Sequence, residues 1–161
     1  MYAFAAANPE KIALIQDERQ LSYGALDAAM DRVAAALQRE GVAPGESVAI
    51  CAATSIEYAC AFLGALRAGV AVAPIAPSST PESIVDMVAD CGAKVFFLDK
   101  GVADALGDRL GSVKAKLVGL DDGAPGVRHD QFIAPEGEKP TPVIISKEMP
   151  FNIIYSSGTT G

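Results

Sequence analysis

The chain has 161 residues, of which half are hydrophobic, and this length and composition fit one soluble domain with a sizeable core. Lys and Arg total 13 against 20 Asp and Glu, and the formal net charge of −7 argues against nucleic acid or an anionic membrane as the main partner. A local phosphate site remains compatible with this charge, because exposed charges more than a Debye length away, about 8 Å at physiological salt, are largely screened.

Three segments with the periodicity of regular structure open the chain. Ile12–Ile15 is a short β-type run. From Ser22 to Gly41, apolar side chains recur on one helical face, and the glycine marks the end of the predicted helix. After a Pro-Gly turn, Ser47–Cys51 has the continuous apolar character of a buried strand.

The next helix is predicted from its capping pattern. Thr54 is followed three residues later by Glu57, which is the spacing of a capping box, and the helix should continue through Arg67. Gly69 is expected to end it. The apolar stretch Val70–Pro74 then predicts another strand.

The alternation of strand and helix continues to residue 120. An N-cap threonine, a first-turn proline and a first-turn acid at residues 80–82 predict a helix that ends near Gly92. A strand, a short helix and a strand are then expected at Lys94–Leu98, Val102–Leu110 and Ala115–Leu120. Repeated strand and helix units predict an α/β fold with a parallel sheet flanked by helices, whose compact core spans about residues 12–120.

The end of the chain divides into two predicted parts. Residues 121–150 contain five prolines and three glycines, and we expect them to form a long surface connection. Phe151–Tyr155 is predicted to be a last strand. It runs directly into Ser156–Gly161, which has the sequence SSGTTG.

The cysteines and the only histidine are interpreted as residues without a chemical role. Cys51, Cys60 and Cys91 are odd in number and include no CxxC pair, so we expect reduced, buried side chains rather than a disulfide framework or a zinc site. His129 lies in a polar stretch and is interpreted as a solvated loop residue rather than a catalytic base. The start of the chain has no basic segment followed by an apolar run, so a cytoplasmic, reduced compartment without a membrane span is expected.

The SSGTTG sequence places four hydroxyls and two glycines in six positions after an apolar strand. Glycines let backbone N–H groups turn toward an anion and hydroxyls add donors, a composition that suits a phosphate cradle. The same composition is also typical of a plain flexible turn. The loop is not a Walker motif, which needs the pattern GxxxxGK[ST] with its lysine.

Three segments together resemble one enzyme family. FNIIYSSGTTG at Phe151–Gly161 resembles the phosphate-loop signature of the adenylate-forming superfamily, which includes acyl- and aryl-CoA synthetases, peptide-synthetase adenylation domains and luciferases. LSYGAL at Leu21–Leu26 and LRAGVAVAP at Leu66–Pro74 are similar to the first two core motifs of that superfamily and occur in its order. The resemblance covers nearly the whole chain. One departure is Ala76, where family members often carry an acidic or polar residue, and it leaves the subfamily open.

The resemblance implies a function for the loop. It implies that residues 1–161 are an amino-terminal piece of an AMP-binding enzyme, an acyl-CoA synthetase that uses ATP with Mg²⁺ to activate a fatty or aryl acid and CoA as co-substrate. The loop hydroxyls would hydrogen-bond the β and γ phosphates, and its glycines would let the backbone approach them closely. These six residues are Ser156, Ser157, Gly158, Thr159, Thr160 and Gly161. The remaining nucleotide and magnesium contacts would lie beyond them, so no catalytic residue or metal ligand is assigned and this chain alone is expected to be inactive.

Two other functions stay open from the sequence. Within the same chemistry, the chain could belong to an adenylation domain that loads a carrier protein. From a different class, it could be a non-catalytic α/β binding module. We also expect self-association of the chain, because a body that is 50% hydrophobic should expose the surface that a following subdomain covers in this superfamily.

Overall fold

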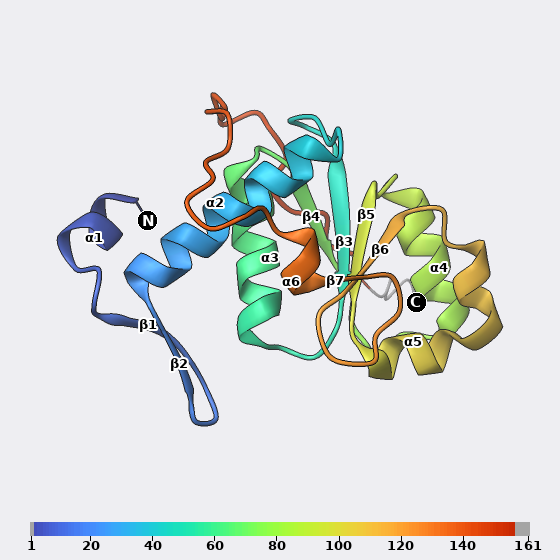
Figure 1. Ribbon diagram of the computed structural model, residues 1–161. Helices are drawn as coiled ribbons and strands as arrows, with labels where there is room; N and C mark the ends of the chain where they lie inside the picture. The colour runs from blue at the N-terminus through green and yellow to red at the C-terminus, as the bar shows by residue number, and fades with distance from the viewer. Residues whose placement is uncertain (1, 157–161) are drawn as a thin grey trace.

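A five-stranded parallel sheet with helices on both faces forms the body of the molecule (Figure 1). The computed structural model describes residues 2–156. In chain order the elements are α1 (Tyr2–Ala7), β1 (Ile12–Gln16), β2 (Arg19–Ser22), α2 (Tyr23–Arg39), β3 (Ser47–Cys51), α3 (Ile56–Arg67), β4 (Ala71–Pro74), α4 (Pro81–Asp90), β5 (Val95–Leu98), α5 (Lys100–Leu106), the 3₁₀ helix η1 (Gly107–Ser112), β6 (Lys116–Gly119), β7 (Val127–Arg128) and α6 (His129–Phe132).

The sheet has the strand order β4-β3-β5-β6-β7, and every neighbouring pair is parallel. The connection from β3 leads through α3 to one side, and the connection from β5 leads through α5 to the other. The strand order therefore reverses between β3 and β5, which is the topological switch point of an open α/β sheet. The predicted α/β fold with a parallel sheet flanked by helices is confirmed.

Two apolar clusters lie on opposite faces of the sheet. Alternate strand residues such as Val48 and Ile50 pack against α2, α3 and α6, and the residues between them, such as Ala49 and Cys51, pack against α4 and α5. Figure 1 shows these helices as two layers on either side of the strands. This alternation follows from the two-residue period of side chains along a strand.

Several helix ends form where the sequence predicts them. The Ser22 hydroxyl accepts a hydrogen bond from the N–H of Ala25 at the start of α2. Thr80 caps α4 in the same way, with a proline at the first position of that helix. Beyond α3, Gly69 has a φ of 72°, and this left-handed conformation, which glycine adopts without strain, ends the helix.

The predicted capping box of α3 is wrong. The N-cap is Ser55, whose side chain accepts a hydrogen bond from the N–H of Tyr58, so the helix begins one residue later than expected. Thr54 is exposed. The Glu57 carboxylate does not close a capping box with Thr54, because it forms an ion pair with Arg19 of the neighbouring hairpin.

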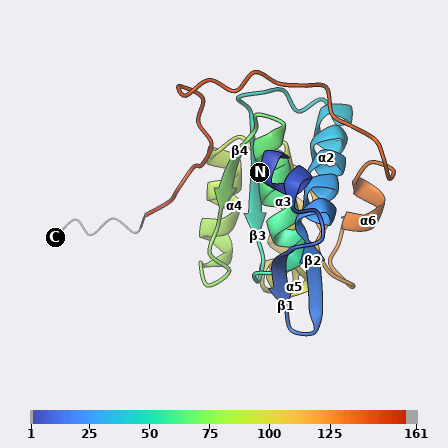
Figure 2. The same cartoon turned by 90° about the vertical axis from the view of Figure 1, so that its left-hand side faces the viewer.

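The first predicted strand is half of a hairpin that the sequence pattern did not predict. β1 pairs with β2 in an antiparallel hairpin that is separate from the main sheet. The hairpin packs on α2 and α3 through Leu14 and Leu21, which contact a cluster formed by Leu26, Met30, Ile56 and Cys60. Figure 2 shows it projecting from one end of the helical layer.

Residues 121–150, expected to be a surface connection, also contribute to the core. They form β7 at the edge of the sheet and the short helix α6. The Phe132 side chain is 1% exposed and packs edge-to-face on Phe97, with ring centroids 5.7 Å apart. A burial of this kind stabilises a segment whose local sequence favours turns.

Two further predictions change in detail. The helix predicted at Val102–Leu110 ends at Leu106 and continues as η1, because Gly107 has a φ of 52°. The strand predicted at Phe151–Tyr155 is reduced to a single parallel bridge between Asn152 and Val72 of β4. Across residues 2–156, no helix is both long and apolar enough to cross a membrane.

The contact between α2 and α3 depends on Gly64. A Cβ atom added at this residue would lie 2.5 Å from the Cβ of Val33 and 3.1 Å from the carbonyl oxygen of Met30. The first distance is shorter than packed carbon atoms tolerate, the second is tight, and Val33 is fully buried. The two helices can therefore approach this closely only with glycine at position 64.

We predict that Gly64→Ala destabilises the fold by about 1–3 kcal/mol, because an added methyl group in a packed contact forces the helices apart. Gly111→Ala is the matched control, since nothing lies within 4 Å of a Cβ there. Urea unfolding followed by circular dichroism measures both. Equal stability of the two variants would contradict the predicted close packing.

Large apolar side chains are exposed along the last described part of the chain. Ile144, Ile145, Phe151 and Ile154 have exposed fractions of 94%, 56%, 66% and 74%. We predict that the chain self-associates through these side chains, so that light scattering detects larger particles as the concentration rises. Replacing Ile144 and Ile154 by Lys should return it to the monomer. A wild-type chain that is monomeric at every concentration would contradict this prediction.

Candidate functional site

The residues before the predicted phosphate loop extend the parallel sheet beyond β4. The N–H of Val72 donates to the carbonyl oxygen of Phe151 at 3.1 Å, and the N–H of Ile153 donates to the carbonyl oxygen of Val72 at 2.9 Å. The chain therefore leaves the edge of the sheet in a direction that β4 sets, directly before residues 156–161.

Tyr155 anchors the residue that precedes the loop. Its hydroxyl lies 2.7 Å from Oδ2 of Asp90 and 3.1 Å from the carbonyl oxygen of Met87, both in α4. Burial and the hydrogen bond to Asp90 raise the pKa of Tyr155, so the phenol stays a hydrogen-bond donor at neutral pH. Its ring packs with Ile153 against the apolar cluster under α4.

The loop itself is described only at its first residue. Ser156 is exposed and follows the anchored Tyr155. Residues Ser157, Gly158, Thr159, Thr160 and Gly161 lie outside the described part of the chain. The phosphate contacts assigned to the six residues stay predictions.

A polar pocket of about 490 Å³ lies at the carboxyl edge of the sheet. Its walls come from the loop after β3 at residues 52–55, from Asp99 after β5, from residues 120–122 after β6 and from residues 128–130 at the start of α6. The lining also includes Gln16, Arg19 and Glu57. The pocket thus occupies the switch point between β3 and β5, where open α/β sheets commonly bind ligands.

Carboxylates hold the loops around this pocket. Asp99 accepts hydrogen bonds from the N–H of Ala53 at 2.7 Å and from the N–H of Val102 at 2.8 Å. Asp121 accepts one from the N–H of Lys100 at 2.9 Å. These bonds fix the ends of β3, β5 and β6 relative to one another.

The charge of the pocket does not suit a triphosphate. Its lining has two guanidinium groups, Arg19 and Arg128, and each is paired with an acid of the same lining. The five lining carboxylates belong to Glu57, Asp99, Asp121, Asp122 and Asp130. Because negative charges exceed positive ones, this pocket disfavours a polyanionic ligand.

His129 is not the solvated loop residue that its polar neighbours in the sequence predict. It is half-buried at the start of α6, and its Nε2 atom is buried without a hydrogen-bond partner among the residues that the structure describes. Burial lowers the pKa of its imidazole, although the nearby Glu57 and Asp130 oppose that shift. The sequence could not show this burial, because it follows from the docking of β7 and α6.

The three cysteines are free in the structure. Cys51 and Cys60 are buried and Cys91 is partly buried. Burial raises the pKa of the Cys51 thiol to about 12 and of the Cys60 thiol to about 11, so neither is a nucleophile at neutral pH. Within residues 2–156, no three His, Cys, Asp or Glu side chains come together in a way that could hold a metal ion.

The AMP-binding enzyme family matches residues 1–161 of the sequence, which include the predicted phosphate loop. The chain belongs to this family. Its members are adenylate-forming enzymes, which act on carboxylic acids with ATP. The parallel sheet and the polar segment that leaves it at Ser156 are therefore part of an AMP-binding fold.

Related proteins include both a peptide synthase and CoA ligases. A dimodular nonribosomal peptide synthase of Bacillus subtilis (strain 168) is 31% identical over 157 residues, which are 98% of this chain and 6% of that protein. The anthranilate CoA ligase AuaEII, solved with anthranoyl-AMP, has a TM-score of 0.88 at 23% identity over 96% of this chain and 31% of its own. A benzoate CoA ligase from Burkholderia xenovorans LB400 has a TM-score of 0.75 at 26% identity over 86% of this chain and 28% of its own. The chain thus spans about a third or less of the length of these proteins.

We predict that His129 makes the stability of the AMP-binding fold depend on pH. The imidazole pKa is lowered in the folded state, so below about pH 6.5 the unfolded chain takes up a proton that the folded chain does not. Stability is therefore fully present above about pH 6.5 and falls as the pH drops toward the folded-state pKa, by at most about 1.4 kcal/mol per pH unit.

The measurement is urea unfolding at several pH values between about 7.5 and 5.5, which bracket the ordinary pKa of histidine. His129→Gln should remove the slope in this range, because His129 is the only histidine of the chain. The same slope in both proteins would contradict the assignment to His129.

Proposed function

We propose that this chain is part of an ATP-dependent acid–thiol ligase that activates a carboxylic acid as an acyl-adenylate and transfers the acyl group to CoA. The observation that carries the proposal is the family match over residues 1–161, which includes the SSGTTG loop at the end of a segment held on β4 and α4. A non-catalytic binding module is less favoured, because its function would leave that loop without a role.

The loop serves the first half-reaction. A carboxylate is a poor electrophile and must be activated before a thiol can attack it. In the activation step its oxygen attacks the α-phosphorus of ATP, and pyrophosphate leaves. Negative charge grows on the leaving group in the transition state, and preorganised donors aimed at it contribute about 3 kcal/mol each, by analogy with oxyanion-hole deletions. Ser156, Ser157, Thr159 and Thr160 would supply hydroxyl donors, and Gly158 and Gly161 would let backbone N–H groups approach the phosphates.

The described residues fit this role in two ways. The Tyr155 anchor and the bridge to β4 give the loop a fixed starting point, which preorganisation requires. The exposed Ser156 leaves its hydroxyl free to face a ligand. Magnesium would accompany ATP as part of the substrate, and we assign it no ligand on this chain.

The acceptor has a second candidate. The dimodular nonribosomal peptide synthase is a relative at 31% identity over nearly the whole chain, and this favours an adenylation domain that loads a carrier protein. The benzoate CoA ligase, at 26% identity, favours CoA. Presenting the acyl-adenylate to CoA and to a phosphopantetheinylated carrier protein in parallel reactions distinguishes the two acceptors.

We predict that the complete enzyme catalyses pyrophosphate exchange that depends on a carboxylic acid. Changing Thr159 and Thr160 together to Ala should slow adenylation about a thousandfold and the thiol step far less, because pyrophosphate leaves only in the first step. The two half-reactions are timed separately, the second from a preformed acyl-adenylate.

Thr141→Ala is the control. This threonine is exposed, and its two hydrogen bonds with Gln38 use its backbone, which the substitution keeps. Equal slowing of both half-reactions would contradict the assignment of the loop to pyrophosphate. An unmutated enzyme without acid-dependent exchange would contradict the proposed function itself.

A further inference from the structure

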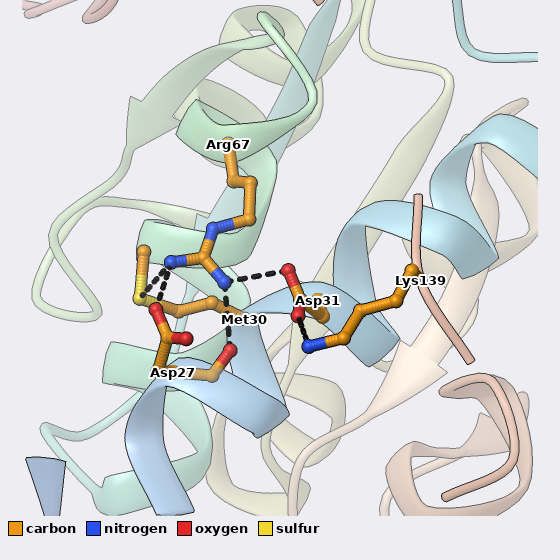
Figure 3. A network of polar contacts seen from close by, with 5 residues as sticks. All are labelled: Asp27, Met30, Asp31, Arg67 and Lys139. Carbon is orange, nitrogen blue, oxygen red and sulfur yellow. Dashed lines mark hydrogen bonds and ion pairs between the residues drawn. The ribbon is translucent and has the colours of Figure 1, made fainter. Parts of the chain in front are cut away.

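An ion network joins the two family motifs that the proposed chemistry does not use (Figure 3). Arg67, in the LRAG sequence at the end of α3, donates from Nη1 to the backbone oxygen of Asp27 at 2.7 Å and to Oδ1 of Asp31 at 2.6 Å. Its Nη2 pairs with the Asp27 carboxylate. Asp27 directly follows the LSYGAL sequence, so the guanidinium connects both motifs through α2.

Asp31 has a second cationic partner. Its other oxygen, Oδ2, pairs with the Nζ of Lys139, which lies in the segment after α6. The Asp31 side chain is 11% exposed, whereas that of Lys139 is 66% exposed. Figure 3 shows the two cations approaching the carboxylate from opposite sides. One nearly buried carboxylate thus couples α3 to the distant segment.

Residues 132–141, which we call the strap, follow α2 through further contacts (Figure 2). Arg39 and Arg32 donate to the carbonyl oxygens of Phe132 and Ala134, each at 2.6 Å. Gln38 exchanges two hydrogen bonds with the backbone of Thr141, at 2.9 and 2.8 Å. The strap is therefore fixed along α2 at several points, and Lys139 supplies its only ion pair within the described chain.

Residues 142–150 connect the strap to the segment on β4 and pass over Gly69, the last residue of LRAG. A Cβ at Gly69 would lie 2.9 Å from Cγ1 of Val143 and 3.3 Å from Cε of Met149. Both side chains thus occupy the space that the glycine leaves. Two residues after Met149, the chain reaches the bridge to Val72.

We propose that the LRAG motif positions the chain that leads into the SSGTTG sequence: Arg67 through Asp31 and Lys139, and Gly69 through Val143, hold the segment that carries residues 151–156 onto β4. Asp31 and Lys139 are positioning residues in this arrangement, since they act on the loop only through the strap. The effect on nucleotide binding rests on the function proposed above, whereas the mechanical coupling does not.

The first test measures hydrogen exchange in the chain itself. The N–H of Thr141 reports the strap, and the N–H of Ile153 reports the bridge to β4. The N–H of Val102, which donates to Asp99 at the start of α5, reports a local opening away from the strap. Lys139→Met should speed exchange at the first two amides about two- to fivefold, the range expected for loss of a partly exposed ion pair, and leave Val102 unchanged. Lys139→Arg should restore the wild-type rates.

Lys147→Met is the matched control, because this exposed lysine lies on the same segment and forms no ion pair with the described residues. Faster exchange at Thr141 without any change at Ile153 would overturn the proposal, since the strap would then not hold the bridge. Equal effects of Lys139→Met and Lys147→Met would also overturn it. Asp31→Asn should also speed exchange at Thr141 and Ile153 relative to Val102. The absence of that effect would count against the coupling.

The second test uses the complete enzyme. Lys139→Met should raise the KM for MgATP about two- to fivefold with little change in kcat, and Lys139→Arg should restore it, because a displaced loop weakens nucleotide binding before it affects chemistry. An unchanged KM together with faster exchange at Ile153 would overturn the link to the nucleotide. An enzyme that does not use ATP would refute the proposed function and leave the exchange result standing.

Discussion

The burial of β3 on both faces and along both edges is the constraint on which the rest of the structure depends. All five of its residues are buried, and it pairs with β4 on one side and β5 on the other. A strand without polar alternation needs apolar cover above and below, which α2 and α3 supply on one face and α4 and α5 on the other. Ser47, the one polar residue of the strand, satisfies its hydroxyl by donating to the carbonyl oxygen of Cys91.

The same arrangement separates two polar regions at the sheet. β3 and β5 diverge in their connections, and the pocket between their ends has more carboxylates than guanidinium groups in its lining. Two of these carboxylates, Asp99 and Asp121, accept backbone N–H groups. β4 is the edge strand of the sheet, and residues 151–153 pair with its outer side. Because the pocket is acidic, an anionic ligand is disfavoured there, and the proposed phosphate site lies instead in the sequence that follows the segment at β4.

The close contact of α2 and α3 gives the motif residues their long-range partners. Gly64 lets the helices approach, and Arg67 then reaches two carboxylates of α2 at low exposure. A guanidinium in such a place is stabilised only if its donors are matched, and the backbone oxygen of Asp27 accepts a further hydrogen bond from it. The strap is held by residues of the same helix, and Asp31 pairs with both Arg67 of α3 and Lys139 of the strap.

Local signals in the sequence determined a large part of this fold. The apolar runs of β3 and β4 predict strands without any knowledge of their partners. Thr80 and Pro81 specify the start of α4 through bonds within four residues. The sheet is parallel because its strands alternate with helices, which the pattern also contains. The motifs are also local features of the sequence, so a resemblance based on the motifs and their order was sufficient to identify the family.

Tertiary structure decided the features that depend on distant partners. Thr54 and Ser55 are both able to cap α3, and Ser55 does so where the Gln16 side chain accepts the N–H of Ile56. α6 has four residues and is too short to be stable alone, so its existence depends on Phe132 packing against Phe97. The burial of His129 follows from that docking, and the partners of Arg67 follow from the distance between α2 and α3. The sequence specifies contacts within a turn or a strand, whereas only the folded chain brings together side chains that lie tens of residues apart.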